Sequence, residues 1–297
     1  MINKKNKVLV TGAKGFVGKV LVKFLKKKNI KVISHDKKLI DLSKKLLVKK
    51  YLKEKQPNTI VHLASRTVSE CKSKKEDKLQ YQNTFLPTKN IIDNVKFCHS
   101  LKKIIFVGSN EEYGSAKLPY RENSVELPTS SYGMCKLRAM RYVNKERKKI
   151  NAKLDILWLR PSLMFGFGDS SRRFMGGILF KLKSYKKKVI NVGSQKRDYL
   201  YVKDFCKFIY FLISKKNISN KLFILNVSDE NWVKLKNVLK FIIKNVKKKY
   251  REKITINHKS DKSKLLNSGK LLKKNYPKFK FTKFEKSLKK TIKDYEL

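Results

Sequence analysis

A glycine-rich turn near the N-terminus constrains the fold of this chain more than any other feature. Residues 11–18 (TGAKGFVG) directly follow the apolar stretch 8–10, which predicts a turn between a strand and a helix. The glycines of the turn are Gly12, Gly15 and Gly18. They let the backbone bend sharply, approach a pyrophosphate without a Cβ clash and pack the helix close to the sheet. The turn therefore predicts a bound dinucleotide, with Phe16 and Val17 among the cofactor-binding residues.

A carboxylate follows the second apolar run, where a dinucleotide ribose would lie. Asp36 comes after residues 30–33 and 24 positions after Gly12, and it could accept hydrogen bonds from the adenosine ribose. It would repel a 2′-phosphate and therefore favours NAD. Lys37 and Lys38 could instead neutralise that phosphate and favour NADP. The sequence leaves the cofactor open as NAD or NADP.

Apolar runs of strand length alternate with helical patterns along the first half of the chain. The expected strands are 7–11, 30–34, 59–63, 103–107 and 154–159. The expected helices are 15–28, 43–55, 77–100 and 131–150. This alternation predicts an α/β fold with a Rossmann-like doubly wound parallel sheet.

The rhythm changes after Pro161, where a glycine-rich loop begins. We expect a dinucleotide-binding Rossmann domain built from residues 1–165 and 197–225. Residues 166–196 and 226–297 are expected to form a smaller C-terminal α/β substrate-binding part. The tail of that part need not join the first sheet.

The composition excludes several classes of protein. A chain of 297 residues that is 41% hydrophobic can bury a large core. We find neither a signal-peptide pattern nor an apolar run of membrane-spanning length, so we expect a cytoplasmic protein without a membrane partner. The four cysteines lie far apart and lack the spacing of zinc sites, which indicates reduced thiols and no metal. They are Cys71, Cys98, Cys135 and Cys206.

The formal net charge of +51 could reflect a polyanionic partner such as nucleic acid. However, the lysines are spread along almost every expected helix, whereas a nucleic-acid footprint requires clustering on one face. Short lysine runs at 26–28, 186–188 and 247–249 fit solvated helix faces or turns. We therefore interpret the charge as compositional bias and expect no specific nucleic-acid partner.

Three polar residues have the spacing that hydride chemistry at a carbonyl requires. Ser109 follows the fourth expected strand, and Tyr132 and Lys136 lie four residues apart on the next helix, hence on one face. An ammonium beside a phenol stabilises the phenolate, so Tyr132 could transfer a proton while Ser109 holds the same substrate oxygen. Together with the glycine turn, these residues would meet at the carboxyl edge of one sheet.

These residues and several further motifs resemble the extended short-chain dehydrogenase/reductase family of nucleotide-sugar epimerases, dehydratases and reductases. Residues 62–65 (HLAS) resemble its third-strand motif, which assigns Leu63 and Ala64 to the cofactor site. The resemblance also assigns Tyr132 and Lys136 to the cofactor site, in addition to their catalytic part. Asn83 resembles its helix asparagine, and residues 113–114 (YG) resemble the pair that follows the catalytic serine segment. The resemblance implies an enzyme of polysaccharide biosynthesis that oxidises or reduces C4 of a nucleotide sugar.

The resemblance also implies contacts elsewhere in the chain. Asp41 resembles an acidic residue that lies near adenine in the family, and Leu42 beside it is assigned to the same cofactor site. Asp41 could equally belong to the N-cap region of the next helix. Residues 197–199 (RDY) resemble a late signature whose arginine contacts the diphosphate, and the Arg197 guanidinium could bind two phosphate oxygens. Further substrate candidates are Ser162, Arg172 and Arg173. The last two could equally be surface charges.

Other family features have a structural interpretation here. His62 lies among apolar neighbours, so we assign it no catalytic function, and Asn83 is also interpreted as structural. Family dimers form through helices that correspond to 77–100 and 131–150. A homodimer is therefore one option, although two lysine-rich helices would repel each other.

Residues 108–114 (GSNEEYG) discriminate between reactions. Glu111 resembles the base of dehydratases and could remove a proton at C5, but Asn110 cannot donate a proton as a carboxylic acid would. The chain also resembles GDP-fucose synthases, yet their acid/base cysteine and histidine correspond to Glu111 and Gly168. Residues 109–114 (SNEEYG) also resemble 4-keto-6-deoxymannose reductases, and this resemblance favours reduction of a 4-keto-6-deoxy sugar nucleotide. The alternatives are a 4-epimerase, a 4,6-dehydratase, or a non-catalytic dinucleotide-binding or RNA-associated scaffold.

Overall fold

The computed structural model describes residues 6–69, 71–150, 154–184, 188–215, 223–252, 254–258 and 263–297. The chain forms two compact units. The first unit comprises Met1–Lys117, Glu122–Pro161 and Cys206–Asn226. The second unit comprises Leu118–Arg121, Ser162–Phe205 and Val227–Leu297.

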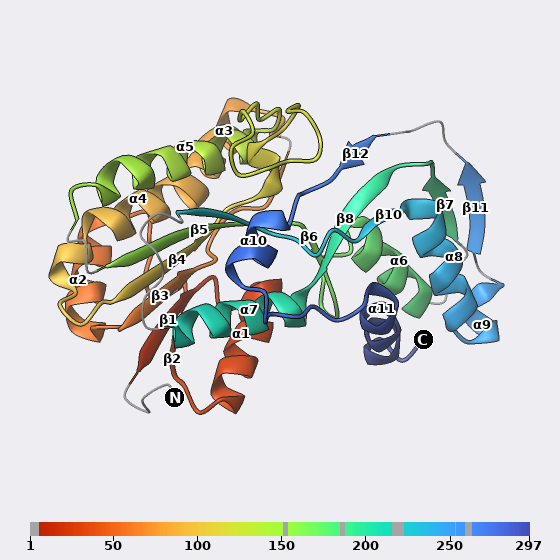
Figure 1. The fold of residues 1–297 in the computed structure, drawn as a ribbon, viewed down its shortest axis with the longest axis horizontal. Helices are drawn as coiled ribbons and strands as arrows, with labels where there is room; N and C mark the ends of the chain where they lie inside the picture. Colours follow the sequence, from red (N-terminus) through yellow and green to blue (C-terminus); the bar gives the residue numbers. More distant parts are fainter. Residues whose placement is uncertain are drawn as a thin grey trace. The chain divides into compact units, whose positions relative to one another are not determined.

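The first unit contains a six-stranded sheet with the order β2-β1-β3-β4-β5-β9 (Figure 1). Its strands are β1 (Lys7–Thr11), β2 (Lys31–Ser34), β3 (Thr59–His62), β4 (Lys103–Val107), β5 (Asp155–Pro161) and β9 (Ile224–Val227). The ladders that join β1 to β5 are parallel. The five expected strands are confirmed to within two residues at each end, and the fold class is Rossmann-like α/β.

Helices cover both faces of this sheet. They are α1 (Phe16–Lys27), α2 (Lys45–Lys55), α4 (Leu86–Asp93), α5 (Ser131–Arg147) and α7 (Val202–Ser214). Figure 1 shows α1 and α7 on one face and α2, α4 and α5 on the other. Every residue of β3 and β4 is buried, as expected for the central strands of a parallel sheet. Apolar side chains of α2, α4 and α5 pack with these strands into one hydrophobic core.

The helical segment expected over residues 77–100 is confirmed in part: it begins at Lys74, continues through a π-helical turn to Asp93, and is followed by a 3-10 turn. The segment forms α3 (Lys74–Gln80), a π-helical turn (Tyr81–Phe85), α4 and a 3-10 turn (Val95–Phe97). Ser73 accepts a hydrogen bond from the Glu76 N–H, and this cap starts α3 before the expected point. Pro87 has no N–H to donate to the preceding turn, and its ring displaces the carbonyl four residues earlier. That carbonyl lies in the π-helical turn, which absorbs the mismatch.

The second unit is built on a small mixed sheet. β8 (Lys196–Tyr201) pairs in parallel with β6 (Leu163–Phe165) and β12 (Lys264–Leu265), and antiparallel with β10 (Trp232–Lys234). A separate parallel pair joins β7 (Lys188–Val192) to β11 (Ile254–His258). Of the C-terminal tail, β9 joins the edge of the first sheet, whereas β10, β11 and β12 pair within the second unit.

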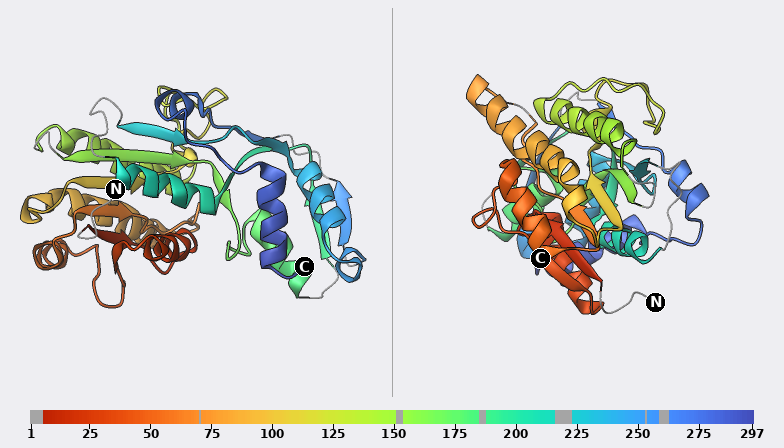
Figure 2. Two further views of the ribbon diagram at one scale, coloured as in Figure 1. Left: turned by 60° about the horizontal axis from the view of Figure 1, so that its bottom comes forward. Right: turned by 90° about the vertical axis from the view of Figure 1, so that its left-hand side faces the viewer.

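Helices of the second unit complete its core. They are α6 (Phe174–Lys183), α8 (Leu235–Asn245), α9 (Lys248–Arg251), α10 (Lys270–Asn275) and α11 (Phe284–Asp294). α8 and α11 lie side by side and bury apolar side chains with those of β8 and α6 (Figure 2). The strand pairing places residues 162–165 and 197–205 in the second unit, whereas the expected division put them in the Rossmann domain.

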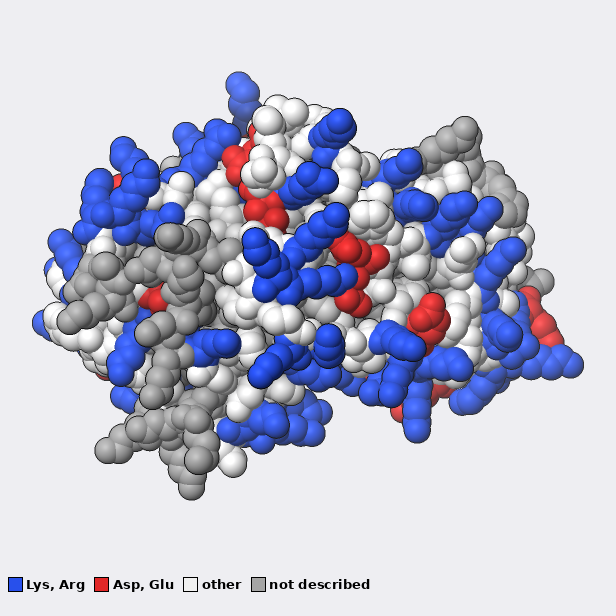
Figure 3. All heavy atoms as spheres, in the orientation of Figure 1, with Lys and Arg blue, Asp and Glu red and all other residues white. Residues whose placement is uncertain are grey.

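Basic side chains are spread over the whole face of the molecule shown in Figure 3, and acidic ones form only small groups there. Within the described ranges, no helix is long and apolar enough to cross a membrane. The same ranges contain no cluster of histidine, cysteine and carboxylate groups that could hold a metal ion. The cysteines are free. The run expected at 186–188 lies mostly outside the described residues.

Candidate active site

The glycine turn lies where the strand order of the first sheet reverses. β1 is flanked by β2 on one side and by β3 on the other, and ligands of open α/β sheets bind at the carboxyl ends of strands at such a point. Gly12 follows β1 with a φ of +66°, and a Cβ there would lie 2.8 Å from the backbone nitrogen of Ala64. A side chain at this position would therefore collide with the segment that follows β3.

The helix after the turn packs directly on it. A Cβ at Gly18 would lie 2.1 Å from the carbonyl oxygen of Gly12, so α1 can approach this closely only with glycine. Gly15 is the N-cap of α1, and no side chain caps the first turn, which contains Phe16 and Val17. The first N–H groups of a helix lack intrahelical partners and suit a phosphate. These residues therefore fit the pyrophosphate of a dinucleotide.

A chain of hydrogen bonds joins this turn to the end of β3. The Thr11 hydroxyl oxygen accepts the N–H groups of Leu63 at 3.1 Å and Ala64 at 3.2 Å. Its own proton therefore points to Nδ1 of His62, 2.8 Å away. Nε2 of His62 then carries the ring proton and donates to Thr88 Oγ1 at 3.1 Å. Burial lowers the pKa of His62 well below its ordinary value. His62 is a neutral structural residue, and sequence reasoning missed the two threonines.

The carboxylate expected at the ribose contacts two lysines. Asp36 accepts a hydrogen bond from the Lys14 ammonium, and its other oxygen accepts the Lys38 N–H at 3.0 Å. The Lys14 hydrogen bond is the main reason why the pKa of Asp36 lies below its usual range. Lys37 donates instead to the side-chain oxygen of Asn83. Sequence reasoning gave Lys14 no function, although it lies inside the glycine turn.

Asp41 and Leu42 belong to the turn between β2 and α2. Asp41 Oδ1 accepts the Ser43 N–H at 2.9 Å, which is typical of an aspartate that closes a turn before a helix. Leu42 is buried, and its carbonyl oxygen accepts a hydrogen bond from Asn90 Nδ2 at 2.9 Å. Both residues therefore stabilise this turn locally, and their contact with a cofactor stays a prediction.

Ser109 lies at the carboxyl end of β4 and caps a 3-10 turn (Asn110–Glu112). Its hydroxyl oxygen accepts the Glu111 N–H at 3.2 Å, and the Glu112 carboxylate accepts the Ser109 N–H at 2.8 Å. Ser109 is only 9% exposed. This reciprocal capping holds the serine at the edge of the sheet.

Tyr132 and Lys136 share one face of α5, as the spacing indicates. The Lys136 Nζ lies 5.9 Å from the centroid of the Tyr132 ring and donates to the carbonyl oxygen of Val107, at the end of β4, at 2.7 Å. Lys136 is 2% exposed, and burial lowers its pKa to about 8 although Glu112 acts in the opposite direction. The arrangement places a buried ammonium beside a phenol, next to β4, which Ser109 follows.

Glu111 is held against the start of α5. Its two carboxylate oxygens accept hydrogen bonds from Ser69 Oγ at 3.0 Å and Ser130 Oγ at 2.6 Å. The Ser130 oxygen also accepts the Gly133 N–H at 3.0 Å and so caps the helix that carries Tyr132. The structure therefore brings Glu111, Ser109 and the start of α5 together. Sequence reasoning missed both serines.

The predicted substrate residues lie in the second unit. Ser162 donates a hydrogen bond to Asp198, whose pKa burial raises to about 6. The Arg197 guanidinium donates to the carbonyl oxygen of Ser263 at 2.8 Å and to its hydroxyl at 2.9 Å. The additional candidates Arg172 and Arg173 are exposed. Binding of a diphosphate by these residues stays a prediction.

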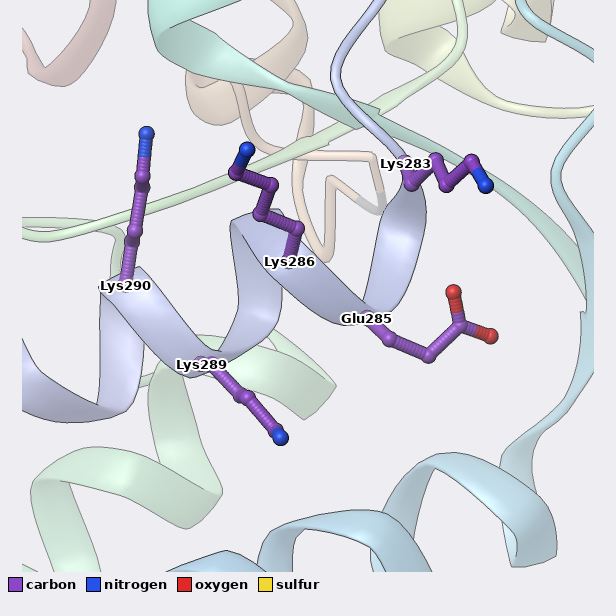
Figure 4. A pocket seen from close by; sticks show the side chains of 5 residues that line it. All are labelled: Lys283, Glu285, Lys286, Lys289 and Lys290. Atoms are coloured by element: carbon purple, nitrogen blue, oxygen red, sulfur yellow. The ribbon is translucent and has the colours of Figure 1, made fainter.

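A hollow of about 430 Å³ lies on α11, and none of the predicted site residues lines it. It is lined by Lys283, Glu285, Lys286, Lys289 and Lys290 (Figure 4). Figure 4 shows these side chains extending in different directions from the helix without converging on one point. We interpret the hollow as part of a solvated, lysine-rich helix face.

Similarity to known proteins agrees with this geometry. The 229-residue match to dTDP-4-dehydro-6-deoxyglucose reductase of Escherichia coli is 29% identical and covers 68% of this chain and 70% of that protein. GDP-L-fucose synthase of Sinorhizobium fredii is 24% identical over 70% of both chains. The crystal structure of a dTDP-4-dehydrorhamnose reductase from Clostridium acetobutylicum has a TM-score of 0.79 at 21% identity, covering 98% of this chain and 100% of that one.

A second solved structure has the same overall fold. GDP-mannoheptose C4 reductase from Campylobacter jejuni, with NADP bound, has a TM-score of 0.83 at 17% identity and covers 100% of this chain and 99% of that one. At this identity, the likeness shows the fold alone. The decisive match is to a family model that spans residues 8–227, from the first strand of the Rossmann sheet to its last. The chain belongs to the NAD dependent epimerase/dehydratase family.

Proposed function

We propose that this protein reduces the C4 ketone of a nucleotide-activated 4-keto-6-deoxy sugar. The observation that carries the proposal is the Tyr132 and Lys136 pair on α5, with its ammonium bound to the end of β4 beside Ser109. This arrangement can deliver a proton to an oxygen at the carboxyl edge of the sheet. The E. coli reductase among the relatives supports reduction over the other reactions of the family.

Each residue has a separate part in the proposed step. A bound dinucleotide supplies the hydride that reaches C4. Tyr132 donates its phenolic proton to the C4 oxygen, so the ketone becomes an alcohol and the tyrosine is left as a phenolate. Lys136 stabilises that phenolate through its positive charge, and the Ser109 hydroxyl holds the same substrate oxygen. Solvent then returns a proton to Tyr132.

We infer that the ribose end of the cofactor site accepts NADP as well as NAD. A free carboxylate at Asp36 would repel a 2′-phosphate, but here the Lys14 ammonium already binds it. Lys37 and Lys38 add two positive charges next to it. The NADP bound to the C. jejuni reductase is consistent with this inference. In the second unit, Arg197 and Ser162 are our candidates for the substrate diphosphate and sugar.

Glu111 favours a second candidate function, dehydration. Its carboxylate lies on the same turn as Ser109 and could remove a proton at C5. A dTDP-D-glucose 4,6-dehydratase of Dictyostelium discoideum, 26% identical over 250 residues, is among the relatives, although this chain matches only 57% of its length. Asn110 stands where an acid would be expected, and an amide cannot donate a proton to a departing hydroxyl as a carboxylic acid does.

The first test is to denature the purified protein and identify any released dinucleotide by mass. Epimerases and dehydratases return the hydride to the same sugar, so a retained NAD favours those reactions. An empty site that binds NADPH or NADH favours the reductase. Consumption of the reduced dinucleotide is then followed spectroscopically with a panel of nucleoside diphosphate 4-keto-6-deoxy sugars. A protein that binds neither dinucleotide contradicts both functions.

A further inference from the structure

Two consecutive glutamates at the end of β4 have opposite environments. Glu111 is half-buried and bonded to serine hydroxyls, whereas Glu112 is completely buried. The Glu112 carboxylate accepts hydrogen bonds from the Ser109 N–H at 2.8 Å, from Trp158 Nε1 at 3.0 Å and from Arg160 Nε at 2.6 Å. All of these donors except the Ser109 N–H come from β5, the neighbouring strand. A charged anchor therefore joins the Ser109 turn to β5.

The anchor leaves no room for a side chain at the start of the turn. A Cβ at Gly108 would lie 2.2 Å from Trp158 Nε1 and 2.3 Å from Glu112 Oε1, so the backbone packs directly against the carboxylate and the indole. Arg160, also completely buried, donates at 2.6 Å to Glu126 as well. Its guanidinium lies 4.4 Å from the centroid of the Tyr113 ring, just after the turn. Buried charges are costly unless paired, and here each has several partners.

We propose that Glu112 is a positioning residue of the active site, which fixes the Ser109 turn and provides the negative charge beside the Lys136 ammonium. This inference rests on the proposed function, which gives Lys136 a part in proton transfer, and on the expectation from the family resemblance that Lys136 also contacts the dinucleotide. Glu112 itself touches neither substrate nor cofactor in this proposal. It acts through the backbone of Ser109 and through the charge of Lys136.

The surroundings of Lys136 explain why a charge is needed there. The hydrogen-bond acceptor of its ammonium is a neutral carbonyl at the end of β4. Burial lowers its pKa to about 8, and Glu112 raises it, as does the adjacent Cys135. His62 faces it from β3, and the pKa of that imidazole is so low that it carries no charge. Tyr132 lies on the same helix face. Arg160, which binds Glu112 at 2.6 Å from β5, carries an opposing charge, and Glu112 is still the group that raises the pKa of Lys136 most.

The test measures dinucleotide affinity between about pH 6 and pH 10, which needs no sugar substrate. In the wild type, affinity should fall as pH rises through about 8, because Lys136 loses its proton. We call the pH at which half of this affinity change has occurred the midpoint. In Glu112→Gln, the midpoint should move down by about one pH unit or more, which is the usual effect of losing a nearby opposite charge. Glu111→Gln is the matched control, since it removes the adjacent carboxylate, and its midpoint should coincide with that of the wild type.

Three further variants make the outcome unambiguous. Lys136→Met should remove the fall in affinity altogether, which identifies the titrating group. Trp158→Phe removes the indole N–H that donates to both carboxylate oxygens of Glu112 but leaves the charge of Glu112 in place, so the midpoint of this variant should not move. If Glu112→Gln does not fold, Glu112→Asp replaces it, because this variant keeps the charge but shortens the side chain. Its midpoint should stay near that of the wild type. Its turnover should fall, because Ser109 loses its anchor.

The failures are distinguishable. A wild type that binds no dinucleotide overturns the proposed function and this inference together. If the wild type binds a dinucleotide but the pH midpoint of its affinity coincides with that of Glu112→Gln, only the inference is overturned. A midpoint that moves equally in Glu111→Gln would also overturn it, because the effect would then come from general charge and not from the buried anchor.

Discussion

Replacing Lys136 by methionine should make the protein more stable at neutral pH, although the lysine is a candidate active-site residue. The pKa of Lys136 falls from 10.5 to about 8 in the folded protein. That difference of about 2.5 units corresponds to about 3 kcal/mol of unfavourable free energy for keeping the ammonium charged inside. Losing its hydrogen bond to the Val107 carbonyl costs about 1 kcal/mol. The net expectation is about 1–2 kcal/mol of added stability at pH 7.

The pH dependence distinguishes this origin from better packing. Because the folded-state pKa lies below that of the unfolded chain, the destabilisation is fully present below about pH 8 and disappears as pH rises to 10.5. Between these values the unfolded state binds more protons, so the wild type gains stability with pH and Lys136→Met does not. The advantage of the variant should therefore shrink by about 2 kcal/mol between pH 7 and about pH 9.5.

Urea unfolding of both proteins at these two pH values measures the effect. Lys103→Met is the matched control. Lys103 is also buried and burial lowers its pKa too, but it has an ion pair with Asp155 at 3.6 Å and donates to the carbonyl oxygens of Leu212 and Lys215, both at 2.7 Å. We expect these three contacts to outweigh the cost of burying its charge. That variant should be less stable than the wild type. A Lys136→Met protein that is less stable at pH 7, or whose advantage is the same at both pH values, would refute the reasoning.

Three further outcomes are expected. Tyr132→Phe should abolish turnover and leave dinucleotide affinity nearly unchanged, and an active variant in a kinetic assay would contradict the proposed chemistry. Gly18→Ala should lose about 1–3 kcal/mol of stability and its dinucleotide binding, since its Cβ would lie 2.1 Å from a backbone oxygen. In the control Gly15→Ala, the nearest atom to the new Cβ is a backbone oxygen at 3.2 Å, so this variant should unfold at nearly the wild-type urea concentration. Lys14→Ala should weaken NADPH binding at least about tenfold relative to NADH, because it exposes the charge of Asp36 to the 2′-phosphate; an unchanged ratio in calorimetry would count against Lys14 as a selector.

Several features of the fold could be predicted because they depend on local patterns. The strands of the Rossmann sheet are continuous apolar runs, and the turn after β1 has glycine at each position where a Cβ would strike backbone. Tyr132 and Lys136 face the same way because helical geometry places residues four apart on one face. The π-helical turn inside the helix expected over 77–100 was not predicted, because it arises where Pro87 perturbs a turn that its neighbours would otherwise continue.

Other features depend on partners far away in the sequence. Nothing local distinguishes Glu111 from Glu112, and their environments differ because Arg160, 48 residues later, lies beside only one of them. The neutral state of His62 likewise depends on hydroxyl groups of Thr11 and Thr88, which reach it from other elements.

The sequence by itself determined the class of the fold, the position of the dinucleotide turn and the tyrosine–lysine pair, because each follows from spacing along one or two adjacent elements. Only the tertiary structure decided which acidic groups are buried anchors and which stay accessible, because burial and charge pairing arise when separate strands meet. Lys14 illustrates this difference: its place in the turn is visible in the sequence, but its ion pair with Asp36 exists only because β1 and β2 are neighbours.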